Sequence, residues 1–407
     1  MKLKRTILLV FIFILALTTV SFGADNLNIY SEAVILLENT TGKTLYEKNS
    51  EQKMYPASTT KIMTAILAIE KGNLNDVVTV SKTALAQMKP GYSSAYLSEG
   101  EIMSVQNLLT VLLVHSANDA SNVLAEYISG SIDKFVDLMN DKAKEIGCTN
   151  THFVTTNGLH DDNHYTTAKD LSIIARYCMR NETFRKIVSM RSCTIPATNK
   201  SAQRIYKNTN DLLNVSSIYY YQPCIGIKTG YTSEAKNCLV SACSKNGLQL
   251  IAVVLGASLT ENNRSARYVD SKTIYDYAYS TYSKETIAKK SSVLKTIEVK
   301  NATSETKNLD LILEKDITAL VNNNTKDNIT YEINLNDEIQ APIEANSVLG
   351  TVTYKVDGDT YTENILASHE VTKKDYFFIF ILIIILLIFT ILIILKLLNK
   401  KQRKIKN

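Results

Sequence analysis

The feature that most constrains this chain is an apolar run near its C-terminus, at residues 377–398, in which Lys396 is the only charged residue. A helix needs about 20 consecutive apolar residues to cross a hydrocarbon core, and this run has that length. The residues after Leu395 are rich in Lys and Arg, and such a flank normally stays in the cytoplasm. The sequence therefore predicts a transmembrane helix over residues 377–398, a basic cytoplasmic tail over residues 399–407, and a body outside the membrane.

The N-terminus has the pattern of a secretory signal peptide. Basic residues between 2 and 5 precede an apolar run at residues 7–17, and the small residues Ser21 and Gly23 follow. A basic start, a short apolar core and small residues before the cut are typical of such signals. We therefore predict an export signal over residues 1–23, and an uncleaved anchor remains the alternative.

The net charge of +5 comes from the two ends of the chain. Without the basic residues of the signal and of the C-terminal tail, the remaining charge is negative. A basic surface that would attract nucleic acid is therefore not expected on the exported part.

Cysteine usage does not indicate a disulfide framework. The chain has six cysteines and no Cys-x-x-Cys. Export permits disulfides, but a chain of this length can be stable without them. Cys238 and Cys243 lie in an apolar stretch and are expected to be buried small side chains, whereas the redox state of the six stays open.

Residues 27–283 have the pattern of a single α/β domain, of the kind also described as α+β. A hairpin is predicted from residues 33–37, a turn containing Gly42, and residues 44–47. Apolar residues then recur at helical spacing, and strands return after residue 195. The predicted helices cover 61–70, 105–114, 118–128, 132–146, 167–179 and 267–282, and the late strands cover 224–230, 238–243 and 250–255. The early and late strands are expected to share one sheet.

Residues 293–368 predict a separate, small all-β domain of sandwich or barrel type. Short alternating segments are separated there by Asn, Asp and Gly, a pattern typical of strands and turns. The clearest segments are 309–313, 329–335, 348–356 and 360–365. Residues 369–376 are expected to form a polar spacer before the membrane.

Ser58 and Lys61 stand three residues apart where a helix is predicted to begin. The commonest role of a serine there is to cap the helix. The spacing also suits a nucleophile and its base, since residues three apart share a helix face. A lysine can act as a base only if burial or a second cation keeps it neutral.

Two further short motifs offer the remaining groups of such a site. Ser116-x-Asn118 lies between two predicted helices and supplies a hydroxyl and an amide. Lys228-Thr229-Gly230 ends a predicted strand and supplies a cation, a hydroxyl and space for a close approach. The order S-x-x-K, S-x-N, K-T-G matches the set found in class A β-lactamases and penicillin-binding proteins, except that their middle motif is S-D-N.

Longer stretches carry a resemblance to a known family. "YPASTTKIMTAILAIEKG", "LLVHSANDASNVLAEYISGS", "NGLHDDNHYTTAKDLSIIARY" and "GIKTGYTSEAKNCLVSA" resemble the serine-type D-Ala-D-Ala carboxypeptidases, the low-molecular-mass penicillin-binding proteins. The resemblance covers residues 29–282 and implies a penicillin-binding, serine β-lactamase-like transpeptidase domain. Residues 293–367 resemble that family's C-terminal β domain more loosely.

The resemblance implies roles for individual residues. Ser58 would be the acylated nucleophile and Lys61 its general base. Ser116 would join the proton relay, and Asn118 would share in the relay and bind substrate. Lys228 would hold the terminal carboxylate of the substrate.

The same resemblance extends to the end of the third motif and beyond. Thr229 would hold the carboxylate with Lys228, and Gly230 completes the substrate-binding motif. The N–H groups of Ser58 and Tyr231 would form the oxyanion hole; some members have His at the position of Tyr231. Arg267 would be the carboxylate-binding arginine, with Arg264 as the rival assignment.

The resemblance also implies the reaction and the partners. The enzyme would remove the terminal D-Ala from the pentapeptide stems of peptidoglycan through an acyl-enzyme, and β-lactams would inhibit it. It would use no metal or organic cofactor and would bind no nucleic acid. Several members lie on the membrane through an amphipathic helix, whereas the continuous run at 377–398 predicts a crossing.

Three other functions share parts of this sequence pattern. His160-Asp-Asp-Asn-His164 is a candidate zinc site, but a loop is predicted there and no third histidine lies nearby. A β-lactamase would need a glutamate to activate the deacylating water, and no Glu-x-x-x-Asn occurs between Asn118 and Lys228. A penicillin-binding sensor or scaffold with little turnover remains open, because a sequence does not show a rate.

Overall fold

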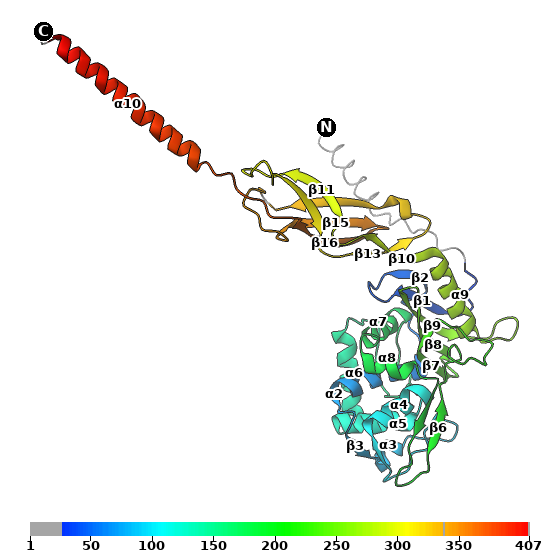
Figure 1. Ribbon diagram of the computed structural model, residues 1–407. Helices are drawn as coiled ribbons and strands as arrows, with labels where there is room; N and C mark the ends of the chain where they lie inside the picture. Colours follow the sequence, from blue (N-terminus) through cyan, green and yellow to red (C-terminus); the bar gives the residue numbers. More distant parts are fainter. Residues whose placement is uncertain (1–26, 337, 406–407) are drawn as a thin grey trace, which may run out of the picture. The chain divides into compact units, whose positions relative to one another are not determined.

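The structure is a computed structural model that describes residues 27–336 and 338–405. The predicted signal segment at residues 1–23 lies outside these ranges. The described chain divides into two compact units between Ser280 and Thr281 (Figure 1). Each unit is described separately below.

The first unit is built on one antiparallel sheet with the strand order β2-β1-β9-β8-β7. The strands are β1 (Ala33–Glu38), β2 (Thr44–Lys48), β7 (Cys224–Thr232), β8 (Lys236–Lys245) and β9 (Leu248–Ala257). β1 pairs with β9, where Ile35 lies opposite Val253. The prediction that early and late strands join one sheet is therefore confirmed, and β7 forms its edge.

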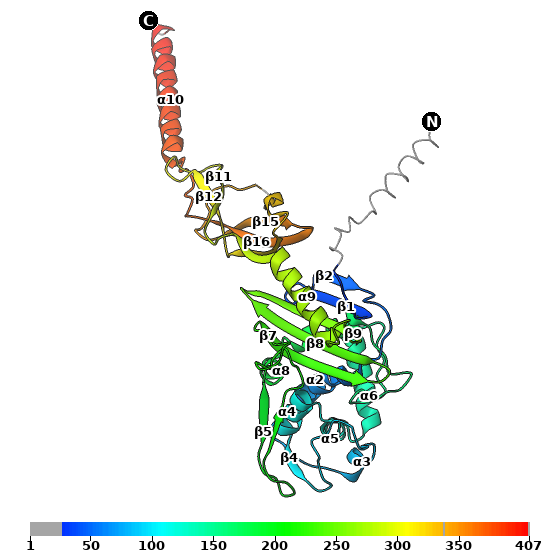
Figure 2. The same ribbon diagram turned by 90° about the vertical axis from the view of Figure 1, so that its right-hand side faces the viewer.

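Helices cover both faces of this sheet (Figure 2). Successive residues of a strand point to opposite faces. Ala33, Ile35 and Leu37 of β1 thus belong to the large apolar core of the helical block. On the other face, α9 (Ala266–Thr281) is tied to β8 by the hydrogen bond between Tyr275 Oη and Ser241 Oγ, at 2.9 Å.

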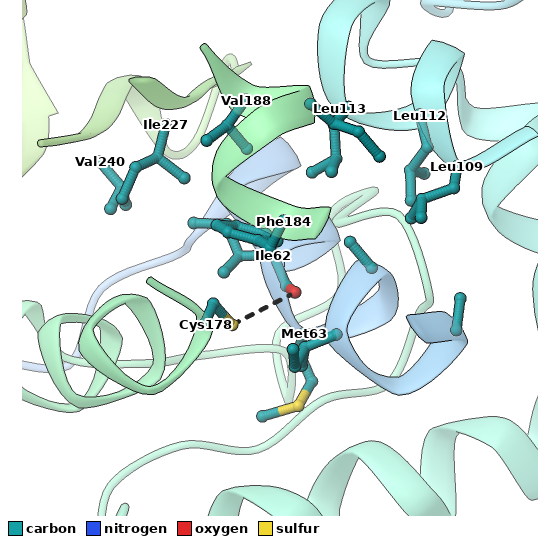
Figure 3. Packing of buried hydrophobic residues seen from close by; sticks show 14 of the residues in the cluster. Ile62, Met63, Leu109, Leu112, Leu113, Cys178, Phe184, Val188, Ile227 and Val240 are labelled. Atoms are coloured by element: carbon teal, nitrogen blue, oxygen red, sulfur yellow. Dashed lines mark hydrogen bonds between the residues drawn. The ribbon is translucent and has the colours of Figure 1, made fainter. Parts of the chain in front are cut away.

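The helical block packs around α2, whose N-terminal end carries Lys61. Ile62 and Met63 of α2 lie among Leu109, Leu112 and Leu113 of α4 and Phe184 and Val188 of α8 (Figure 3). The helices of the block are α2 (Lys61–Lys71), α3 (Lys82–Leu85), α4 (Val105–His115), α5 (Asn118–Ser129), α6 (Ile132–Glu145), α7 (Ala168–Cys178) and α8 (Glu182–Val188). The longer helices lie where the apolar periodicity predicts them.

The shortest elements were not predicted. They are α3, α8, the paired strands β3 (Val77–Thr79) and β4 (Ile102–Ser104), and the paired strands β5 (Ser192–Ile195) and β6 (Arg204–Lys207). Strands of three or four residues contain too few alternations to be recognised from side-chain pattern alone. All six cysteines are free and buried, which confirms the prediction for Cys238 and Cys243.

The second unit contains an all-β domain, as predicted. A five-stranded sheet has the order β11-β12-β16-β15-β14, and β10 pairs with β13. The strands are β10 (Tyr282–Ala288), β11 (Val293–Glu298), β12 (Asn308–Leu313), β13 (Ile317–Asn322), β14 (Thr330–Leu335), β15 (Val348–Val356) and β16 (Asp359–Ala367). Leu309, Leu311, Val352 and Ile365 form the centre of its core.

Backbone pairing extends this β domain at both ends beyond the expected residues 293–368. Residues 282–288 form β10, which pairs with β13, although residue 283 was the expected end of the preceding domain. The expected polar spacer at residues 369–376 also takes part, because Val371 pairs with Ile343 and Lys373 with Ala302. These pairings are made by the main chain, which the side-chain pattern does not reveal.

The helix α10 (Phe377–Ile405) contains the apolar run Phe377–Leu398, long and apolar enough to cross a membrane. Its large hydrophobic side chains are exposed, and none of the run is buried within the described structure. An exposed apolar face of this size is unfavourable in water, so the helix fits a membrane anchor. The helix continues through Ile405, into the region expected as a basic tail.

Candidate active site

Ser58 and Lys61 lie in hydrogen-bond contact at the start of the helical block. A short 3-10 helix, Ala57–Thr60, leads directly into α2 at Lys61. The Nζ of Lys61 donates to Ser58 Oγ at 2.8 Å. Neither helix start has a side-chain cap, so Ser58 does not act as the capping residue. Ser58 is partly exposed and thus open to a ligand.

The amine of Lys61 is fully buried and held from a second direction. Its Nζ also donates to the main-chain oxygen of Asn157 at 2.7 Å. Burial, together with the nearby charge of Lys228, lowers the pKa of Lys61 well below its ordinary value, and Asp119 opposes this shift. The low pKa favours the neutral amine, which is the form that can accept a proton.

Gly158 allows the loop that carries Asn157 to approach the 3-10 helix. Its φ of +83° lies in the left-handed region. A Cβ at this position would lie 1.8 Å from the main-chain oxygen of Ala57. Only glycine fits both this backbone conformation and this contact.

Lys228 and Thr229 lie in β7, beside the serine. Both are buried. The Nζ of Lys228 donates to the main-chain oxygen of Thr229 at 2.9 Å. Burial lowers the pKa of Lys228 to about 7, and the charge of Arg267 contributes. The charge of Lys228 in turn disfavours the charged form of Lys61.

Gly230 brings the edge strand against the main chain of the serine. A Cβ at Gly230 would lie 3.1 Å from Ser58 N and 3.0 Å from the oxygen of Pro56. A larger residue would thus crowd the N–H of Ser58. Tyr231 follows in β7, and its side chain is 65% exposed, so this end of the strand faces solvent.

The structure brings Arg267, of the two candidate arginines, to the third motif. Arg267 lies on α9, and its Nη1 donates to the oxygen of Gly230 at 3.3 Å. Its guanidinium also lies 4.7 Å from the ring centroid of Tyr268, and its Nε is buried without a hydrogen-bond partner. Arg264 is exposed in the turn before α9.

Ser116 and Asn118 lie between α4 and α5. Ser116 ends α4 in the left-handed conformation, with φ 68° and ψ 28°, and Asn118 begins α5. Both are buried, and Asn118 Oδ1 has no hydrogen-bond partner, so this amide has an unused acceptor. The left-handed residue reverses the chain between the two helices and sets both side chains in one short segment.

Several polar residues of this region were not predicted as part of the site. Thr209 links α4 to the third motif, since its N–H donates to the main-chain oxygen of Val114 at 3.2 Å and its Oγ1 lies 2.6 Å from Thr229 Oγ1. Asp119 accepts from Ser94 Oγ and from main-chain N–H groups of the same loop. Isolated polar residues such as Thr209 and Asn157 give no sequence signal; the pair Asn157-Gly158 indicates only a turn.

The histidine-rich segment is not arranged as a zinc site. His164 is buried, with Nε2 2.8 Å from Thr60 Oγ1 and Nδ1 accepting from two main-chain N–H groups. His160 Nε2 lies 3.4 Å from Asp162 Oδ1. Within the described residues, no group of three or more His, Cys, Asp or Glu side chains is placed to hold a metal ion.

Comparison with known proteins identifies the family. The sequence profile of the peptidase S11 family, described as D-alanyl-D-alanine carboxypeptidase, matches residues 20–259. The chain belongs to the D-alanyl-D-alanine carboxypeptidase family. A second profile, described as the C-terminal domain of penicillin-binding protein 5, matches residues 282–373, so this carboxypeptidase has both domains of the penicillin-binding type.

Curated relatives of the carboxypeptidase cover most of its length. It is 36% identical to the D-alanyl-D-alanine carboxypeptidase DacF of Bacillus subtilis over 85% of this chain and 87% of that protein. It is 30% identical to the carboxypeptidase DacA of Haemophilus influenzae over 92% of this chain and 96% of that protein. The family places this chain among the serine peptidases, which are hydrolases.

Solved structures agree with this assignment. Penicillin-binding protein 5 of Haemophilus influenzae matches the carboxypeptidase with a TM-score of 0.65 and 28% identity, over 86% of this chain and all of that one. A peptidoglycan synthesis regulatory factor of Streptococcus pneumoniae matches with a TM-score of 0.69 and 25% identity, over 84% of this chain and 99% of that one. The predicted fold class is therefore confirmed.

Proposed function

We propose that this carboxypeptidase removes the terminal D-Ala from peptidoglycan pentapeptides through an acyl-enzyme on Ser58, and that β-lactams acylate the same oxygen. The observation that carries this proposal is the 2.8 Å contact between Ser58 Oγ and the buried amine of Lys61. A serine hydroxyl is a weak nucleophile at its ordinary pKa and needs a neutral base within hydrogen-bond reach.

In the acylation step, the neutral amine of Lys61 takes the Ser58 hydroxyl proton while Oγ attacks the carbonyl carbon of the penultimate D-Ala. The N–H groups of Ser58 and Tyr231 hold the resulting oxyanion. Breakage of the peptide bond releases the terminal D-Ala, whose nitrogen takes the proton that Lys61 received from Ser58. Water then attacks the ester carbonyl and gives a proton to Lys61, which passes it to Ser58 Oγ as the ester bond breaks and the peptide leaves as the free acid.

Recognition of the substrate uses the edge strand β7. An edge strand presents unpaired main-chain groups to an extended peptide. Lys228 and Thr229 bind the terminal carboxylate of the substrate, and Arg267 adds positive charge beside the same strand. Gly230 lets β7 lie against the main chain of Ser58, because a Cβ there would lie 3.1 Å from Ser58 N.

Ser116 and Asn118, at the junction of α4 and α5, complete the proposed site. The Ser116 hydroxyl relays the proton toward the nitrogen of the leaving D-Ala. The amide of Asn118, whose Oδ1 lacks a protein partner, binds the main chain of the substrate. Unpaired buried amides are uncommon, and a peptide would supply the missing hydrogen bond.

The cellular location is part of the proposal. Export by residues 1–23 would bring the catalytic domain to the cell wall, and the helix α10 would hold it there, with the basic residues after the apolar run in the cytoplasm. Along the chain, the β domain lies between the catalytic domain and the helix α10.

Two assays on one preparation test the proposal. Labelled penicillin should form a covalent adduct, and a pentapeptide ending in D-Ala-D-Ala should release free D-Ala catalytically. An adduct without release of D-Ala would indicate a penicillin-binding sensor instead. Rapid hydrolysis of penicillin without release of D-Ala would indicate a β-lactamase, and the absence of any adduct would refute both the proposed enzyme and the sensor.

The value of kcat/KM should depend on pH because Lys61 must be neutral and Lys228 must be charged. Lys61 must be neutral to accept a proton, so kcat/KM should fall as the pH drops through its depressed pKa. Lys228 must be charged to bind a carboxylate, so kcat/KM should also fall as the pH rises above about 7. A profile of kcat/KM for D-Ala release should thus be bell-shaped. A rate that stays constant from neutral to strongly alkaline pH would contradict the role of Lys228.

A further inference from the structure

His164 links the loop that contains Asn157 to Thr60, the residue before Lys61. Its Nδ1 accepts hydrogen bonds from the main-chain N–H groups of Val154, at 2.9 Å, and Thr155, at 3.1 Å. A ring nitrogen that accepts carries no proton, so the proton of the neutral ring lies on Nε2. Nε2 therefore donates to Thr60 Oγ1 at 2.8 Å.

The same loop is attached to the helical block on its other side. The main-chain oxygen of Thr156 accepts from Thr64 Oγ1 of α2 and from Ser121 Oγ of α5, the latter at 2.7 Å. The hydroxyl of Thr156 donates to Asn122 Oδ1 at 2.7 Å. The main-chain oxygen and the hydroxyl of Thr156 are thus held by groups from α2 and α5, and the next residue is Asn157.

Asn157 is the residue through which this loop contacts Lys61. Its oxygen accepts from Lys61 Nζ at 2.7 Å, while Nζ also donates to Ser58 Oγ at 2.8 Å. The position of Asn157 therefore helps to set the direction of the Lys61 amine. Thr60, Lys61 and His164 are all buried, so water has little access to replace these hydrogen bonds.

We propose that His164 is a positioning residue for catalysis: its Nε2–H bond to Thr60 holds the loop of Asn157 against the start of α2 and so directs the amine of Lys61 at Ser58. The proposal rests on the function proposed above for Ser58 and Lys61. It assigns a role to the histidine that the sequence offered as a zinc ligand. His164 does not touch substrate and acts through Asn157 and Lys61.

The charge state of His164 fits this role. Burial lowers its pKa to about 4, with His152, His160 and Lys61 acting in the same direction and Asp161 against it. The ring is therefore neutral at physiological pH. A charged ring would place a second N–H against the N–H groups of Val154 and Thr155, which have no acceptor to offer in return.

Two substitutions at residue 164 test the roles of the two ring nitrogens separately. Glutamine places an N–H donor at about the distance of Nε2, whereas asparagine places an acceptor oxygen at about the position of Nδ1. If the bond to Thr60 is what matters, His164→Gln should keep most of the acylation rate, and His164→Asn should lose it. Thr60→Val should have the same effect as His164→Asn, because valine keeps the shape of threonine without its oxygen.

The measurement is acylation by labelled penicillin, with its first-order rate constant, its final extent and the noncovalent dissociation constant obtained separately. We expect His164→Asn and Thr60→Val each to lower the rate constant about tenfold or more, since a misplacement of about 1 Å costs on the order of 10²-fold. The dissociation constant and the final extent should stay near wild type. The double variant that combines His164→Asn with Thr60→Val should be no slower than the slower of the two single variants, because each substitution removes the same hydrogen bond.

Thr110→Val is the matched control. Thr110 is a buried threonine in α4 whose hydroxyl donates to the oxygen of Gln106 at 2.7 Å, within its own helix. It should acylate at the wild-type rate. A purely structural role for His164 would reduce the final extent and the melting temperature and leave the rate constant of the folded molecules unchanged.

Three results would overturn the inference: an unchanged rate constant in His164→Asn, a larger loss in His164→Gln than in His164→Asn, or additive losses in the double variant. Ser58→Ala, measured in parallel, keeps this test distinct from that of the proposed function. If Ser58→Ala still forms the adduct, the proposed function fails whatever the result at residue 164.

Discussion

Lys61→Met is expected to lower the rate constant for acylation by penicillin by about 10²- to 10⁴-fold, the usual contribution of a general base. Methionine fills a similar volume but accepts no proton from Ser58. It also leaves the oxygen of Asn157 without the donor that now lies 2.7 Å away. The adduct should still form, slowly, because the nucleophile and the oxyanion donors remain.

A second variant separates loss of the base from loss of the hydrogen bonds. Lys61→Arg keeps N–H donors toward Ser58 and Asn157, but arginine stays protonated in proteins and accepts no proton. It should therefore be as slow as Lys61→Met. The control is Lys71→Met, at the exposed end of the same helix. Wild-type acylation by a folded Lys61→Arg protein would contradict the role of Lys61 as the base.

Ser58→Ala is expected to abolish turnover of the pentapeptide. Loss of the nucleophile in a serine protease costs on the order of 10⁶-fold in kcat, and a similar loss is expected here. Ser58 is only partly buried, and its hydroxyl caps neither helix start, so alanine should change stability little. Release of D-Ala should fall to background while the melting temperature stays near that of the wild type.

The sequence predicts most of the fold because the long elements have clear periodicity. The helix that begins at Lys61 shows apolar residues at helical spacing, and the late strands show continuous apolar runs. The pairing of β10 with β13 had no such signal, because it depends on main-chain groups far apart in the sequence. The start of the β domain was therefore expected too late in the chain.

The candidate site divides in the same way. Ser58 and Lys61 are three residues apart, so local helix geometry alone predicts their contact. The contacts of Asn157 with Lys61 and of Thr209 with Thr229 join distant parts of the chain, and no local pattern indicates them. His164 shows the converse problem, since a histidine among aspartates suggests a metal ligand until its hydrogen-bond partners are known.

The most direct test of the central claim is the intact mass of the protein with and without penicillin, for the wild type and for Ser58→Ala. The wild type should gain the mass of one penicillin, and Ser58→Ala should gain none under the same conditions. Peptide mapping should place the wild-type adduct on the segment that contains Ser58. A penicillin adduct that persists in Ser58→Ala would contradict the assignment of Ser58 as the nucleophile.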